Sequence, residues 1–332
     1  MTVTTEQPVQ LHHWPEEVEL QMPAPMLPPE PDGEVEPTSD VAVQREPAPP
    51  LSPLLELVRL IFVFVFVLAA GMLIQLTVVS SLQQRSHQQR LYDSFRTRLA
   101  EGTAPLGPTD GDGEVLPVGT AVAYLEIPAI DLRQVVVSGT SSGTLFAGPG
   151  HRRDTVLPGQ AGATVIMGRS AAYGGPFGRL DELAKGDRID VTTGQGEFTY
   201  EVLGVRREGE PLPAPVKADE SRLVLATGDG RPYLPSGVLR VDATMDGEAT
   251  PGPGRLHPSG ALPQEEGLMV GDSSELWALA LWLQVLLVLA LGAVWSWHRW
   301  GRAQAWVVFL PVLTLAGIFV ANQAARLLPN LL

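Results

Sequence analysis

Three long apolar stretches constrain this chain more than any other feature of its sequence. The first covers residues 60–79 and is interrupted only by Gln75 and Thr77, and the others cover residues 276–297 and 303–321. About 20 apolar residues in a helix, rising 1.5 Å per residue, cross the hydrocarbon core of a bilayer. Transmembrane helices are therefore predicted over residues 54–81, 274–297 and 303–325.

The last two stretches are joined by the short segment 298–302, which can connect only antiparallel helices. Its Arg299 and Arg302 favour a cytoplasmic connector by the positive-inside rule, with the chain between the first and second spans outside. Four arginines that follow the first span argue the other way: Arg85, Arg90, Arg96 and Arg98. Three glutamines in or near the spans are expected to form hydrogen bonds between helices: Gln75, Gln284 and Gln323.

The segment before the first span, residues 1–53, is acidic and rich in proline, which predicts a disordered tail. The net charge of -14 argues against a nucleic-acid partner. After the first span, residues 82–114 are predicted to form a helical stalk and a linker. Leu91, Phe95 and Leu99 give the stalk a narrow apolar stripe, which is expected to pack on the neighbouring domain or on a second copy.

Residues 115–245 have a different character, since short runs of strand-forming residues alternate with glycine and proline turns. Such spacing is typical of a closed barrel or a sandwich. Residues 246–273 form a second linker rich in glycine, proline and acidic side chains. The runs predicted as strands are 121–127, 132–137, 163–167, 188–193, 197–205, 222–227 and 238–243.

Four sequence pieces in this region, in order and in register, resemble the sortase family, most closely its class E group. They are Leu125–Leu132, Gly148–His151 with Leu157–Gln160, Thr164–Gly168 with Tyr173–Asp181, and Arg222–Thr227. The resemblance implies a mainly β fold, an eight-stranded β-barrel carried by the three transmembrane helices. It also favours an extracytoplasmic barrel and a cytoplasmic tail on a multi-pass protein of the cell membrane.

A sortase cuts a sorting signal of the Leu-Pro-x-Thr-Gly type between Thr and Gly. In the family a cysteine attacks the Thr carbonyl, a histidine exchanges the proton, and an arginine stabilises charge on the carbonyl oxygen. In this sequence Arg169 stands at the histidine, Gly228 at the cysteine and Gly237 at the arginine, and there is no cysteine anywhere. Glycine cannot form a covalent intermediate, and arginine stays protonated at neutral pH. The sequence therefore predicts a pseudoenzyme with no catalytic residues.

Other residues near these positions could replace the nucleophile or line the cleft. Thr227 and Asp229 flank the vacant position, but a hydroxyl nucleophile needs an adjacent base. His151, the only histidine of the domain, is expected to be a structural hydrogen-bonding residue. Two arginines are candidates to line the cleft and bind a carboxylate, although Arg169 could instead pair with Asp229. The predicted cleft-lining residues are His151, Arg169, Tyr173, Thr227, Asp229 and Arg231.

The leading hypothesis is a membrane-anchored module that binds sorting-signal peptides or partners a true sortase in anchoring proteins to the cell envelope. An active transpeptidase or hydrolase with substituted residues is the alternative, and a structural envelope protein is the third reading. Neither a cofactor nor a metal is predicted, because the acidic residues near the turns, such as Asp181, Glu182 and Asp187, lack ligand spacing.

Overall fold

The computed structural model describes residues 52–109, 114–252 and 262–332. Ser52–Leu332 forms one compact unit. The disordered tail predicted for residues 1–53 lies, except for its last two residues, outside the described residues.

The first membrane helix and the stalk form one continuous helix. Helix α1 (Pro53–Ile74) passes through a π-helical turn (Gln75–Val79) into α2 (Ser80–Glu101). The side chain of Ser52 accepts a hydrogen bond from the Leu55 amide at the start. Gly102 ends the helix in the left-handed conformation that glycine adopts readily, with φ 66°.

The middle of the chain forms a closed eight-stranded barrel, as the resemblance implied. Around the barrel the strands follow the order β1-β2-β3-β4-β7-β8-β6-β5, with parallel β2–β3 and β4–β7 pairs and antiparallel pairs elsewhere. Each of the seven runs predicted as strands forms a strand in the structure. Strand β3 was not predicted, because it has only two residues. The strands are β1 Ala121–Ile127, β2 Leu132–Ser138, β3 Gly150–His151, β4 Gly162–Met167, β5 Arg188–Thr193, β6 Gly196–Arg206, β7 Ser221–Arg231 and β8 Leu234–Met245.

Alternate residues of the strands fill the barrel with aliphatic side chains. Leu125, Ile166, Leu225 and Val241 are all fully buried there. Because successive residues of a strand face opposite sides, the residues between them lie on the outer surface of the barrel. This interior holds the strand ends around the candidate site in fixed positions.

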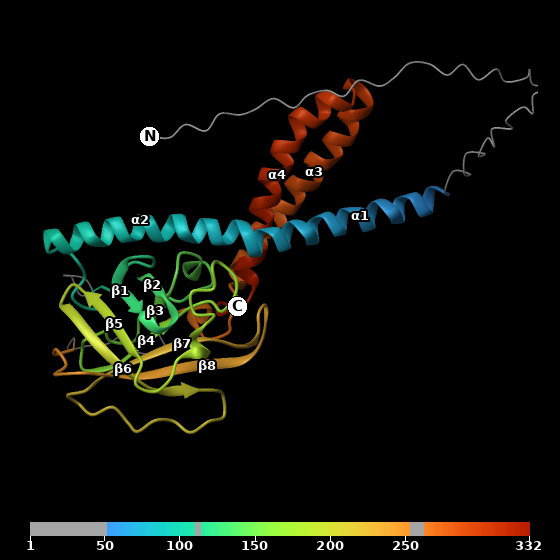
Figure 1. Ribbon diagram of the computed structural model, residues 1–332. Coiled ribbons are helices and arrows are strands. Elements are labelled where there is room, and N and C mark those ends of the chain that lie inside the picture. The colour runs from blue at the N-terminus through green and yellow to red at the C-terminus, as the bar shows by residue number, and fades with distance from the viewer. Residues whose placement is uncertain (1–51, 110–113, 253–261) are drawn as a thin grey trace, which may run out of the picture. The chain divides into compact units, whose positions relative to one another are not determined.

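Helix α2 packs along the β1–β2 side of the barrel (Figure 1). Phe95 is only 1% exposed and contacts Ala121 and Val135, with Leu91 and Leu99 beside it. The apolar stripe of the stalk therefore packs on the neighbouring domain, the first of the two predicted uses. Gln88 adds polar contacts, since its Oε1 accepts from the Val135 amide at 2.7 Å.

The last two apolar stretches form an antiparallel helical hairpin. Helix α3 (Leu276–Trp300) and helix α4 (Arg302–Leu327) are joined by Gly301 alone, which has a φ of 103°. The helices are therefore longer than predicted, and all residues of the expected connector except Gly301 are helical. Stacked rings of Trp282 and Phe319, 4.5 Å apart, hold them together. Within the described residues, three helices are long and apolar enough to cross a membrane.

Polar contacts connect α1 to this hairpin. Gln75 Nε2 donates to Asn322 Oδ1 at 2.7 Å, which confirms an interhelical hydrogen bond for this glutamine. Leu68 of α1 packs against the apolar cluster of α3 and α4. The π-helical turn begins at Gln75, the residue that donates the hydrogen bond to Asn322.

Part of the predicted linker 246–273 packs on the barrel. Glu266 is 3% exposed and pairs with Arg153. Leu268 and Met269 pack on a cluster that includes Leu145. The segment 264–272 therefore covers one end of the barrel next to the candidate site.

Candidate functional site

The strands bring the three family positions to one end of the barrel. Strands β7 and β8 are antiparallel neighbours in which Gly228 lies opposite Val238 and Asp229 lies opposite Gly237. Strand β4 is parallel to β7, and its last residue, Met167, pairs with Ala226. Arg169 follows two residues later, so it leaves the sheet beside Gly228.

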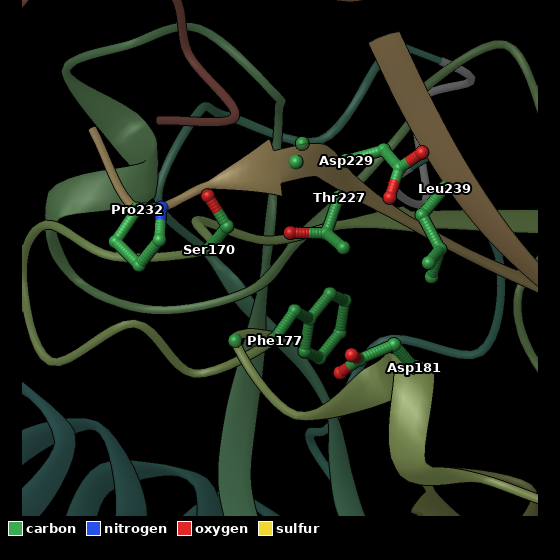
Figure 2. A pocket seen from close by; sticks show the side chains of 10 residues that line it. Ser170, Phe177, Asp181, Thr227, Asp229, Pro232 and Leu239 are labelled. Atoms are coloured by element: carbon green, nitrogen blue, oxygen red, sulfur yellow. The ribbon is translucent and has the colours of Figure 1, made fainter. Parts of the chain in front are cut away.

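A small pocket of about 70 Å³ lies at this point. Figure 2 shows Ser170, Thr227 and Asp229 on one side of it, with Phe177 and Asp181 on the other. This volume has room for a few water molecules and is far below the ~300–1,000 Å³ of ligand pockets. Its lining residues are Ser170, Phe177, Gly178, Asp181, Thr227, Gly228, Asp229, Gly230, Pro232 and Leu239.

Gly228 is closely surrounded on the side where a cysteine side chain would begin. A Cβ atom at this position would lie 3.0 Å from the Leu331 carbonyl oxygen, 3.0 Å from Pro235 Cβ and 3.3 Å from Ser170 Oγ. These distances are shorter than ordinary van der Waals contacts, so any side chain would have to displace its neighbours. The position at which the resemblance places the nucleophile is therefore closely packed.

Arg169 is a buried residue of the protein interior. It is 0% exposed, and its Nη2 donates to the Ser142 carbonyl oxygen at 2.9 Å and to Ser142 Oγ at 2.8 Å. The guanidinium lies 4.9 Å from the centre of the Phe146 ring and 5.2 Å from that of Tyr173. Burial lowers the pKa of Arg169 from 12.5 to about 10, which still leaves it charged at neutral pH.

The two predicted roles of Arg169 need correction. It does not line the pocket, and it does not pair with Asp229, whose Oδ2 instead lies 3.4 Å from Arg207 Nε. The interior position explains this, because a guanidinium covered by Phe146 and Tyr173 cannot reach the β7–β8 edge. Arg231 is exposed and also lies outside the pocket lining.

His151 is fixed inside the barrel as a hydrogen-bonding residue. It is 1% exposed, and its Nε2 lies 2.9 Å from the Val156 carbonyl oxygen, so this nitrogen carries the proton. Burial lowers the pKa of His151 from 6.5 to about 4. A neutral imidazole that is absent from the pocket lining fits the structural role expected from the sequence.

Tyr173 is likewise buried, and it does not line the pocket. Its ring stacks on Phe146 at 3.9 Å, and its amide donates to Ser80 Oγ of α2 at 3.2 Å. Burial raises the pKa of its phenol to about 12. The residue therefore joins the loop after β4 to the long helix.

Thr227 keeps its predicted place in the pocket. Its Oγ1 is buried and has no hydrogen-bond partner among the described residues. Neither histidine nor lysine lines this pocket, and the ionisable groups in its lining are the carboxyl groups of Asp181 and Asp229. Among the residues that the structure describes, no three histidine, aspartate or glutamate side chains gather as metal ligands.

The sequence interpretation missed the residues that fill the neighbouring space. The chain continues past α4 as a short tail, residues 328–332, in which Asn330 and Leu331 are both 0% exposed. The Leu331 carbonyl oxygen accepts from the amide and from Oγ of Ser170, each at 3.1 Å. The sequence Leu328-Pro329-Asn330 was the available signal, since it matches the start of a Leu-Pro-x-Thr-Gly pattern.

Comparisons with known proteins show what the domain that carries this site is similar to. The family model of the sortase domain matches residues 125–234. Sortase D of Bacillus subtilis (strain 168) is 38% identical over 85 residues, which are 26% of this chain and 41% of that protein. The chain thus spans about 41% of the length of this curated relative.

Solved sortase structures are also similar to this chain. The Sortase D5 transpeptidase of Clostridium perfringens gives a TM-score of 0.40 at 22% identity, over 49% of this chain and 99% of that one. The SrtF sortase of Corynebacterium diphtheriae gives 0.36 at 24% identity, over 46% and 95% of the two chains. Residues 125–234 are thus similar to the sortase domain, by the family model and by the curated relative.

Proposed function

We propose that this chain is a membrane-anchored, class E-like sortase relative that binds sorting-signal peptides without cleaving them and so serves the anchoring of proteins to the cell envelope. One observation carries this proposal: the chain has no cysteine, and Gly228 stands where the resemblance to sortases places the nucleophile. A transpeptidase of this type requires a covalent acyl-enzyme, and loss of the nucleophile alone abolishes that route.

The environment of the other family positions supports the same proposal. Arg169 remains charged at neutral pH and is buried away from the pocket, so it has neither the pKa nor the position of an acid–base catalyst. Gly237 offers no charge for a substrate carbonyl. Arg240, the nearest alternative, follows Leu239 in β8, and because Leu239 lines the pocket, Arg240 faces the opposite side of the sheet.

The arrangement of the helices supports an extracytoplasmic barrel. Helix α4 ends beside the barrel, where the Asp272 amide donates to the Arg326 carbonyl oxygen at 2.9 Å. A helix of this length extends for roughly 39 Å, which places Gly301 at the far end of the hairpin. Arg299 and Arg302 are next to that turn and favour the cytoplasmic side by the positive-inside rule. The segment 1–51 would then be cytoplasmic as well.

The test is an assay of the purified full chain in detergent with fluorescent peptides of the Leu-Pro-x-Thr-Gly type. We expect saturable binding by fluorescence anisotropy and no fragment release by mass spectrometry. A peptide in which the Leu-Pro pair is reversed is the matched control. Peptide cleavage that Thr227→Ala abolishes would refute this proposal in favour of an enzyme with a substituted nucleophile, and a chain that binds no peptide would leave a structural role.

A further inference from the structure

The tail 328–332 lies in a groove built by three separate segments: residues 140–142 and 170–172 of the barrel domain, and the segment 264–272 that covers the end of the barrel. The amides of Ser170 and Ala172 donate to the carbonyl oxygens of Leu331 and Leu332, at 3.1 and 3.3 Å. The Asn330 amide donates to the Val270 carbonyl oxygen at 3.0 Å. Main-chain hydrogen bonds of this kind hold an extended peptide whatever its side chains, and they fix its register.

Side chains of the tail are recognised individually. Asn330 Nδ2 donates to the carbonyl oxygens of Thr140 and Gly267, at 2.8 and 2.7 Å, and the residue is fully buried. Leu331 is also fully buried and packs in an apolar cluster with Met167 and other side chains. The groove therefore takes a carboxamide at the third position of the tail and an aliphatic side chain at the fourth.

The residue at the family's histidine position takes part in holding the tail. Arg169 Nη2 donates to Ser142 Oγ, and this hydroxyl in turn lies 3.2 Å from the Leu328 carbonyl oxygen, to which it donates. Arg169 therefore acts on the tail as a positioning residue through Ser142. Gly228 contributes by leaving space, since a Cβ there would be 3.0 Å from the Leu331 carbonyl oxygen.

The register of the tail matches that of a sorting signal. Leu328, Pro329 and Asn330 stand at the Leu-Pro-x positions, and Leu331 stands at the Thr. The carbonyl group of this fourth residue is the one that lies against Gly228, the position of the missing nucleophile. Because the dipeptide Leu-Pro recurs elsewhere in the chain, the position of this fourth carbonyl group against Gly228 is the observation that carries the match.

We infer that the tail 328–332 is the resident ligand of the groove, a substrate mimic held in cis, and that another peptide of the pattern Leu-Pro-Asn-Leu enters only by displacing it. This inference deepens the proposed function and rests on it in treating the groove as a peptide site. It also assigns the specificity of the groove to the carbonyl groups of Thr140 and Gly267 and to the cluster around Leu331.

The experiment compares the full chain with the variant Asn330→Ala in detergent. Hydrogen–deuterium exchange would be followed at the amides of Ser170 and Ala172, which donate to the tail. The labelled peptide Leu-Pro-Asn-Leu-Leu would be titrated in parallel, with Leu-Pro-Ala-Leu-Leu as its control. Asn330→Asp keeps the shape of the side chain and removes both donors, and Leu212→Ala, at a side chain that is 80% exposed, is the unrelated control.

We expect both amides to exchange at least tenfold faster in Asn330→Ala and Asn330→Asp, and the peptide to bind these variants at least tenfold tighter than the parent chain, as loss of two buried hydrogen bonds allows. Unchanged exchange would overturn the inference, as would equal peptide affinity for all chains. If exchange accelerates but no chain binds any peptide, the resident tail stands and the peptide-binding function proposed above fails.

Discussion

Replacing His151 with glutamine should remove a large part of the acid sensitivity of the barrel. The imidazole is buried and neutral, with a pKa lowered from 6.5 to about 4 by burial. Between these two pH values the unfolded chain binds a proton that the folded chain excludes, so stability is lost as the pH falls from about 6.5 to about 4. At about 1.4 kcal/mol for each pH unit, the loss from this one residue is about 3 kcal/mol.

Glutamine is the informative substitution because it keeps an N–H donor for the Val156 carbonyl oxygen and does not titrate. The assay is thermal unfolding of the full chain in detergent at pH values from 7 to 4. Carboxyl groups titrate in both chains, so the measured quantity is the difference between the two curves. We expect that difference to change by about 3 kcal/mol across the range, or roughly 10 °C in Tm for a domain of this size.

The matched control is His87→Gln, which replaces an exposed histidine of α2. An exposed side chain adds little to the packing of the barrel, so this variant controls for the replacement of a histidine by glutamine as such. Parallel curves for the parent and His151→Gln between pH 7 and 4 would refute the reasoning, because they would mean that His151 is not held neutral by burial.

Three further outcomes follow from the packing and the site. Phe95→Ala should cost about 3–5 kcal/mol of unfolding free energy in denaturant titrations, because the side chain is 1% exposed and joins α2 to the barrel. Arg169→Met should leave the unfolding free energy unchanged or raise it by up to about 3 kcal/mol in the same assay, because the buried guanidinium forms no salt bridge within the described residues. A clear loss of unfolding free energy would show that the contacts of the guanidinium with Ser142 and the two aromatic rings outweigh its desolvation. The triple variant Gly228→Cys, Arg169→His and Gly237→Arg should cleave its own chain after Leu331, scored by mass spectrometry, and adding Asn330→Ala, which frees the groove, should reduce that cleavage and allow cleavage of sorting-signal peptides.

Much of the fold could be predicted because it depends on local sequence patterns. The apolar stretches give three helices, and the stripe of Leu91, Phe95 and Leu99 packs as its spacing indicated. The continuity of α1 and α2 was not predicted, because the change from apolar to polar residues after residue 81 was interpreted as the boundary between a span and a separate stalk. The helix continues there because its polar side chains find partners far away in the sequence, as Gln75 does with Asn322 and Gln84 with Gln134.

The candidate site shows the same division between local and distant contacts. The motif register placed Arg169 and Gly228 at one end of the barrel, and the pairing of β4 with β7 brings them together. It did not show that Arg169 is buried against Phe146, nor that Ser170 contacts Leu331. That last contact joins residues 161 positions apart, and no short pattern encodes such a distance.

The seated tail gives a physical reason why the nucleophile and the tail exclude each other. A cysteine at position 228 would bring its sulfur beside the Leu331 carbonyl group, since even the Cβ atom would lie 3.0 Å from the carbonyl oxygen. With a histidine to protonate the leaving nitrogen, a thiolate there would form a thioester with Leu331 and break the peptide bond to Leu332, so the barrel would cut its own chain. In the proposed function, glycine at the nucleophile position removes both the reaction and the steric conflict, and arginine at the histidine position cannot supply that proton but holds Ser142 against Leu328. The replacements at these two positions therefore suit one arrangement, a groove that retains a peptide uncut.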